Sequence, residues 1–203
     1  MSVEIGTVTV QYRSLNPQEF AMLAPPLVDI YLEAMEYSPQ IREDRVAVWR
    51  REVRHPGFAA VIAEQGGVII GVAYGFLGNP DTWWDRQLRR GCAERGEMSE
   101  RQWDILRNYF ELAEIHVRPS AQGQGIGRVL LTELMKLTWA KYALLSTPEV
   151  EGEANLAFGL YRSLGFWDVL RDYVYPGDNR RFAVLGVNLP LGSQQGGAPI
   201  GRL

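Results

Sequence analysis

The six residues from Gln122 to Gly127 read Gln-Gly-Gln-Gly-Ile-Gly and come directly before a helical pattern of apolar residues. Glycines let a loop backbone approach a bulky anion closely and adopt dihedral angles that a side chain would forbid. The first turn of a helix also leaves several N–H groups without partners and carries partial positive charge. The stretch therefore predicts a loop that binds a diphosphate.

The spacing in this loop distinguishes between phosphate ligands. A nucleoside-triphosphate loop would place Gly-Lys-Ser or Gly-Lys-Thr at the helix start, where this chain has Gly127 followed by Arg128. A dinucleotide fingerprint needs a third small residue at position 128, so Arg128 weakens that interpretation, although Glu149 lies at a distance that suits a ribose contact.

Two motifs carry a resemblance to a known family. Gln122-x-x-Gly125-x-Gly127 resembles the acetyl-CoA signature Q/R-x-x-G-x-G/A of the Gcn5-related N-acetyltransferase (GNAT) family. The segment from Asn155 to Phe166, NLAFGLYRSLGF, resembles the helix of the same family written N-x-x-A-x-x-L/F-Y-x-x-x-G-F. The two motifs occur in the family's order, and the resemblance implies acetyl-CoA as a co-substrate and no metal.

The elements around these motifs predict the fold class. Apolar and polar residues alternate from Ala113 to Val117, which indicates a half-buried strand directly before the loop. The order β-α-α-β-β-insertion-β-α-β-α-β-β is a mixed α/β layout. It resembles the acyl-CoA N-acyltransferase fold, in which helices flank a mostly antiparallel central sheet. Strands are expected at Val8–Arg13, Phe58–Ala63, Val68–Phe76, Ala113–Val117, Tyr142–Ser146, Trp167–Tyr175 and Arg181–Val187, and helices at Pro17–Ala34, Ile41–Val53, Asn155–Leu164 and from Ile126 onward.

Three features qualify this layout. We expect a break or kink at Pro25–Pro26 in the first helix, because proline lacks the N–H of a helical bond. An irregular insertion at about 79–107 has too few apolar residues for a core of its own, so residues 1–190 are expected to form a single domain. The glycine-rich segment 191–203 is expected to be a disordered tail.

Composition limits the class of protein. The 203 residues carry a net charge of −3 and no basic tract, which argues against a nucleic-acid surface. The single cysteine, Cys92, cannot form an internal disulfide. The chain has neither a signal-peptide pattern at its first residues nor an apolar run of transmembrane length. We expect a cytoplasmic protein without a membrane partner, and homodimerisation stays open.

The resemblance assigns the cofactor contacts. Backbone N–H groups from Gln122, Gly123, Gln124, Gly125, Ile126 and Gly127 would bind the diphosphate, and Arg128 would either add charge or be a solvated helix residue. Ile115 and Val117 would contact pantetheine through their backbone, with the N–H of Val117 facing the thioester oxygen. Asn155 would contact pantetheine or order the helix start.

Acetyl transfer to an amine also needs a base and an acid. Strand alternation places Glu114 with His116 on the polar face, so Glu114 is the favoured base, acting through a water. Glu111 would replace it if the strand contained a bulge, and His116 has a suitable ordinary pKa. By resemblance Tyr161 would protonate the leaving thiolate, although its helical face also suits core packing.

The acceptor side is open. The region Phe20–Val53, the insertion and the closing hairpin should surround the acceptor, and they contain Tyr31, Glu36, Tyr37, Trp83 and Trp84. The acceptor would be a small amine, such as a polyamine, amino acid or aminoglycoside, or a protein N-terminus. A CoA-binding module without catalysis is the alternative, and a nucleotide-binding oxidoreductase is disfavoured because a second βαβ half is missing.

Overall fold

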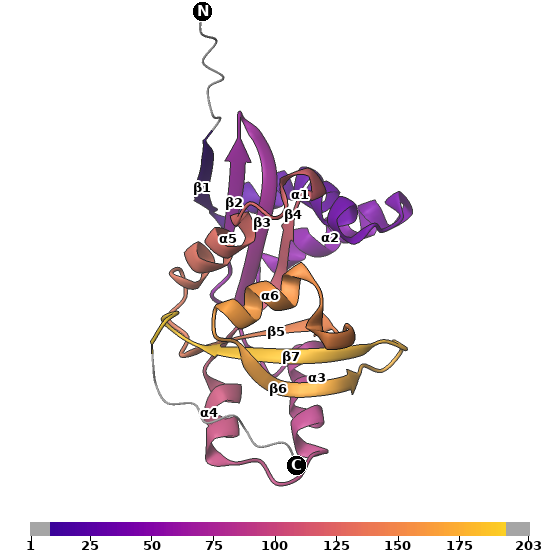
Figure 1. The fold of residues 1–203 in the computed structure, drawn as a ribbon, viewed down its shortest axis with the longest axis vertical. Helices are drawn as coiled ribbons and strands as arrows, with labels where there is room; N and C mark the ends of the chain where they lie inside the picture. Colours follow the sequence, from indigo (N-terminus) through magenta and orange to yellow (C-terminus); the bar gives the residue numbers. More distant parts are fainter. Residues whose placement is uncertain (1–8, 194–203) are drawn as a thin grey trace, which may run out of the picture. The chain divides into compact units, whose positions relative to one another are not determined.

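A computed structural model describes residues 9–193 of the chain (Figure 1). Their strands follow the order β1-β2-β3-β4-β5-β7-β6 in one mixed sheet with flanking helices, which confirms the predicted fold class. The tail expected after residue 190 lies outside the described residues from position 194 onward. The strands are β1 (Val10–Leu15), β2 (Ala59–Gln65), β3 (Val68–Leu77), β4 (Tyr109–Val117), β5 (Tyr142–Pro148), β6 (Trp167–Val174) and β7 (Arg181–Asn188). The helices are α1 (Pro17–Met35), α2 (Arg42–Glu52), α3 (Trp83–Ala93), α4 (Glu100–Arg107), α5 (Ile126–Met135) and α6 (Leu156–Ser163).

The chain divides into two compact units, and β3 and β4 contribute residues to both. The first unit contains residues 9–74 and 114–134, and the second contains residues 75–113 and 135–193. Within the first unit β1 pairs antiparallel with β2, from Val10 opposite Gln65 to Leu15 opposite Ala60. The β2–β3 connection is Gly66–Gly67, and both glycines have positive φ, as a two-residue hairpin turn requires.

Helix α1 is continuous through Pro25 and Pro26, so the expected break does not occur. The residue at position 25 would normally donate its N–H to the carbonyl of Ala21, and proline cannot. The guanidinium of Arg50, from α2, donates to that carbonyl instead at 3.2 Å. Asn16 caps the start of α1, where its side chain accepts from the N–H of Glu19 at 2.9 Å.

The insertion in the second unit forms α3 and α4. Their buried residues share one apolar cluster with strands β4 to β7: Leu88, Cys92, Ile105, Leu106, Tyr109, Leu144, Leu170, Tyr173, Tyr175 and Val184. Asp85 of α3 is fully buried and accepts hydrogen bonds from the hydroxyl of Tyr109 at 2.7 Å and from the guanidinium of Arg89. A buried carboxylate with these partners attaches α3 firmly to β4.

The two interior glycines of β3 lie where neighbouring atoms leave no room for a side chain. A Cβ at Gly71 would lie 2.9 Å from Cδ1 of Leu130 in α5. A Cβ at Gly75 would lie only 2.1 Å from the carbonyl oxygen of Glu111 in β4. Since that oxygen belongs to a strand backbone, it cannot move aside as the end of a side chain can.

Gly75→Ala should therefore destabilise the protein by at least about 2 kcal/mol, as overpacking in a core does. Gly159→Ala is the matched control, because Gly159 lies in α6 with no atom within 4 Å of its would-be Cβ. Alanine there should stabilise by about 0.5–1 kcal/mol through helix propensity. Urea unfolding of both variants measures the difference, and a Gly75→Ala variant as stable as the wild type would contradict the close approach.

Candidate active site

The predicted anion loop has the backbone that its glycines suggest. Gly123 and Gly125 have φ of +74° and +80°, a left-handed region that other residues rarely adopt. No heavy atom lies within 4 Å of a Cβ built on either glycine, and residues 122–125 are exposed. The N–H of Val129 bonds the carbonyl of Gly125 at 3.3 Å in the first turn of α5. N–H groups earlier in that turn are thus accessible to an anion, and the loop fits a diphosphate.

Hydrogen bonds hold the loop to the strands on its N-terminal side. The backbone N–H of Arg118 donates to the carbonyl of Ile70 at 2.8 Å, and its Nε donates to the carbonyl of Ile69 at 3.0 Å. The amide of Gln122 donates to the carbonyl of Val117 at 3.0 Å. The motif glutamine thus ties the loop to the end of β4. Ile115 and Val117 are partly buried in that strand, and Arg128 is exposed in the first turn of α5.

Two of the three base candidates form a hydrogen-bonded pair. Nε2 of His116 lies 2.6 Å from Oε2 of Glu114. The side chain of Glu114 is 24% exposed and that of His116 is 9% exposed. A proton taken from a substrate by one group can pass to the other through this bond.

Aromatic rings from α1 and α2 surround the pair. The imidazole of His116 makes an edge contact with Tyr31 of α1 at 5.0 Å and stacks on Trp49 of α2 at 6.5 Å, measured between ring centroids. Trp49 also contacts Tyr74 of β3 at 5.0 Å. This face of β4 is therefore directed at α1 and α2, which lie beside β3 and β4 in Figure 1.

The remaining predicted residues lie in the second unit. Glu111 is opposite Leu144 in the parallel pairing of β4 with β5. Asn155 caps α6, where its side chain accepts from the N–H of Phe158 at 2.8 Å. Tyr161 is 6% exposed, and its ring lies 5.6 Å from that of Phe166. The capping role of Asn155 is thus seen directly, whereas the roles of Tyr161 as acid and of Asn155 toward pantetheine stay predictions.

The expected acceptor residues are distributed over both units. In the first unit Tyr31 is buried and contacts Tyr37, while Glu36 ends α1 with a positive φ. In the second unit Trp83 is half exposed against Tyr175. Its neighbour Trp84 donates from its indole N–H to the hydroxyl of Tyr175, which lies 2.9 Å from the hydroxyl of Ser146; these bonds order the start of α3.

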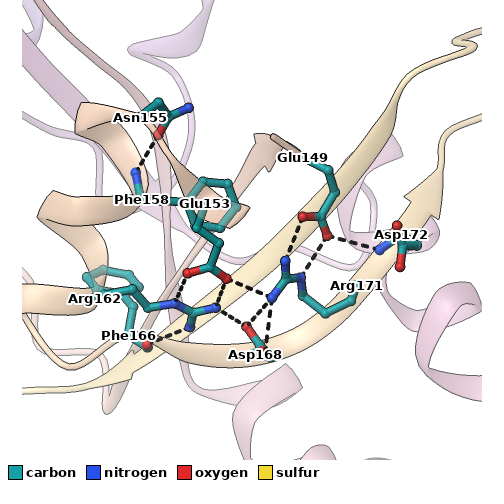
Figure 2. Close-up of polar contacts among 9 residues, drawn as sticks. All are labelled: Glu149, Glu153, Asn155, Phe158, Arg162, Phe166, Asp168, Arg171 and Asp172. Carbon is teal, nitrogen blue, oxygen red and sulfur yellow. Dashed lines mark hydrogen bonds and ion pairs between the residues drawn. The ribbon is translucent and has the colours of Figure 1, made fainter. Parts of the chain in front are cut away.

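A network of charged residues that the motifs do not indicate holds the start of α6 (Figure 2). Glu153 accepts from the guanidinium groups of both Arg162 and Arg171, at 2.6–2.8 Å. Arg171 also binds both oxygens of Glu149 at 2.7 Å, and Arg162 contacts Asp168. These bonds lower the pKa values of Glu149 and Glu153.

The network holds the connection between β5 and α6, which contains a 3-10 turn at Glu151–Glu153. Gly152 and Glu153 both have positive φ, which is costly for a glutamate. The bonds of Glu153 to two arginines hold this conformation, and the loop they hold ends at the Asn155 cap. In the sequence, only the acidic and basic residues between positions 149 and 172 pointed to this network. Which of them pair is decided by contacts between residues far apart in the chain.

Comparison with known proteins identifies the family. Residues 24–166 match the model of the acetyltransferase (GNAT) family. The chain is also 34% identical over 199 residues to the GCN5-like protein acetyltransferase Rv2170 of Mycobacterium tuberculosis, a match that covers 87% of this chain and 97% of the relative. The chain therefore belongs to the GNAT acetyltransferase family.

Solved structures agree at the level of the fold. The ribosomal-protein-S18-alanine N-acetyltransferase of Escherichia coli matches with a TM-score of 0.58 and 18% identity, over 92% of this chain and 98% of that one. The yncA protein of Salmonella typhimurium, solved with its cofactor acetyl-CoA, matches with a TM-score of 0.57 and 17% identity, over 94% and 97% of the two chains. Across residues 9–193 no helix is long and apolar enough to cross a membrane.

We predict that Glu153→Gln destabilises the protein at neutral pH by about 1–2 kcal/mol, since charge-assisted hydrogen bonds at a partly exposed site are lost. The folded-state pKa of Glu153 lies below its ordinary value of 4.5, so the contribution is present above 4.5 and disappears as the pH falls through the lowered pKa. Urea unfolding between pH 7 and pH 3 should show the difference shrinking. Glu94→Gln, which removes an exposed pair with Arg90, is the control and should hardly change stability; an equal loss from Glu153→Gln at both pH values would contradict the assignment.

Proposed function

We propose that this protein transfers the acetyl group of acetyl-CoA to a primary amine, and that the amine belongs to a protein. The observation that carries the proposal is the open loop at Gly123 and Gly125 in the same unit as the Glu114–His116 pair. The name of the 34% identical relative, a protein acetyltransferase, supports a protein as the acceptor. A small-molecule amine is the second candidate for the acceptor.

The roles of the residues follow from the chemistry. Acetyl-CoA supplies an acetyl group activated as a thioester. N–H groups from Gly123 to Gly127 bind its diphosphate, and the backbone of Ile115 and Val117 contacts pantetheine. The Glu114–His116 pair first takes a proton from the ammonium form of the acceptor, and the freed nitrogen lone pair then forms a bond to the acetyl carbon. The bonded nitrogen loses its remaining extra proton to solvent. The carbon–sulfur bond breaks, and the hydroxyl of Tyr161 gives a proton to the thiolate.

A CoA-binding module without catalysis would need only the loop. The hydrogen-bonded pair of Glu114 and His116, partly open to solvent, supports an enzyme instead. The deciding experiment measures free CoA released from acetyl-CoA in the presence of polyamines, amino acids, aminoglycosides and peptides with either a free N-terminus or a free lysine. Acetyl-CoA binding without CoA release for any acceptor would favour the module.

Acetyl-CoA should raise the melting temperature, because a ligand at a hundredfold excess over its Kd adds about 2.7 kcal/mol to the free energy of unfolding. Gly125→Trp should abolish that shift by filling the loop. Gly67→Trp is the matched control, since Gly67 also has a φ near +80° and open surroundings but lies in the β2–β3 turn. A stabilisation by NAD and none by acetyl-CoA would overturn the assignment.

Glu114→Gln should leave acetyl-CoA binding intact and lower kcat/KM by about 10²-fold, the low end for general acid–base catalysis. The deficit should shrink as the pH rises, because more of the amine is then already unprotonated. Glu64→Gln is the control: Glu64 is also a strand glutamate of the first unit with a side chain 24% exposed, and it pairs with Arg13. pH–rate profiles of both variants test this. If the Glu114→Gln profile equals that of the wild type, Glu114 is not the base, and Glu111 or His116 becomes the candidate.

A further inference from the structure

A second carboxylate, which no motif indicates, lies near enough to Glu114 for their charges to interact. Glu52 is the last residue of α2, three residues after Trp49, so the two side chains share one face of the helix. Trp49 stacks on His116, and His116 is hydrogen-bonded to Glu114. The helix face that carries Glu52 is therefore the face that covers the pair. The side chain of Glu52 is 21% exposed, close to the 24% of Glu114.

The surroundings of Glu52 disfavour its negative charge. Its pKa is raised first by burial and then by the charge of Glu114, and the opposing effect of Arg51 is the smallest of the three. His55 lies 3.8 Å away, but burial lowers the pKa of His55, which disfavours a positive charge on its imidazole. An ionised Glu52 thus repels Glu114 without a full countercharge from these neighbours.

An arrangement of this kind suits a cationic ligand. An ammonium group has three donors and one positive charge, so it can bond two carboxylates at once. The rings of Trp49 and Tyr31 are buried beside His116, and the guanidinium of Arg45 lies over the Tyr31 ring, so these rings shape the surroundings of the pair and the two carboxylates supply the charge. Among residues 9–193 no group of three or more metal-ligating side chains is present, so a metal ion is not indicated by the side chains described.

We propose that Glu52 binds the acceptor amine in its protonated form, together with Glu114, and that Glu52 makes the enzyme select alkylammonium acceptors. This inference rests on the proposed function, because it names the chemistry recognised on the acceptor side. The two carboxylates have different tasks: Glu114 removes the proton before the amine attacks, and Glu52 keeps its charge and holds the nitrogen in place. Glu52 thus determines specificity and Glu114 serves as the base.

Substitutions of Glu52 and Glu114 should affect different kinetic constants. Glu52→Gln should raise KM for the amine by roughly 10- to 100-fold, the value of a hydrogen bond to a charged group. Its kcat should stay within about threefold, whereas Glu114→Gln lowers kcat. Glu43→Gln is the matched control, since Glu43 is on the same helix with a side chain 83% exposed, and its KM should equal that of the wild type.

The melting temperature of Glu52→Gln is a second test, because replacing a carboxylate that stabilises the fold would lower it. A carboxyl group whose folded-state pKa is raised costs stability once it is ionised, above its ordinary pKa of 4.5. Glu52→Gln should therefore melt at a higher temperature than the wild type, with the gain growing as the pH rises through the raised pKa. A variant that gains stability and loses acceptor affinity marks a residue kept for binding.

A titration with n-butylammonium chloride tests the cation site without turnover. NMR signals of the Trp49 indole and the His116 imidazole should shift in the wild type and in Glu43→Gln. In Glu52→Gln the same shift should require about tenfold more n-butylammonium. The uncharged n-butanol should cause no shift in any of the three proteins. Equal shifts in wild type and Glu52→Gln, or no response to the ammonium ion, overturn the inference, as does an unchanged KM in an active Glu52→Gln enzyme. Failure of the proposed function looks different: the wild type would then neither bind acetyl-CoA nor release CoA, while the titration would still decide the role of Glu52.

Discussion

The contact between α5 and Gly71 of β3 sets the position of both parts of the candidate site in the first unit. A Cβ at Gly71 would lie 2.9 Å from Leu130, 3.3 Å from the carbonyl of His116 and 3.5 Å from Ile126. Ile126 is the first residue of α5, and His116 carries the polar pair on β4. Because one position without a side chain brings helix and strand close together, the anion loop and the Glu114–His116 pair are held by the same packing.

Electrostatics then divides the first unit into two kinds of surface. The start of α5 offers N–H groups and partial positive charge, which suit a diphosphate. Glu114 on the face of β4 toward α1 and α2, together with Glu52 at the end of α2, supplies carboxylates that suit an ammonium ion. Burial and the charge of Glu114 raise the pKa of Glu52, so its ionised form is disfavoured in the free protein, as is common for groups at functional sites.

The second unit stabilises its elements by other means. The insertion is held by the apolar cluster of α3 and α4 and by buried Asp85, so it is integrated into the core of that unit. The start of α6 depends on the bonds of Arg162 and Arg171 to Glu153. The guanidinium groups of Arg162 and Arg171 offset the unfavourable backbone angles of this connection. They thereby fix the start of the helix that carries Asn155 and Tyr161.

The sequence by itself determined the features that depend on a few neighbouring residues. The Asn16 cap, the Gly66–Gly67 turn, the loop at Gly123 and Gly125, and the element order all follow from local hydrogen bonds and dihedral preferences. Only the tertiary structure decided that α1 continues through its prolines, because Arg50 comes from another helix. It alone placed Glu52 near Glu114 and paired Glu153 with its two arginines, since long-range packing brings these charges together and leaves no periodic pattern in the sequence.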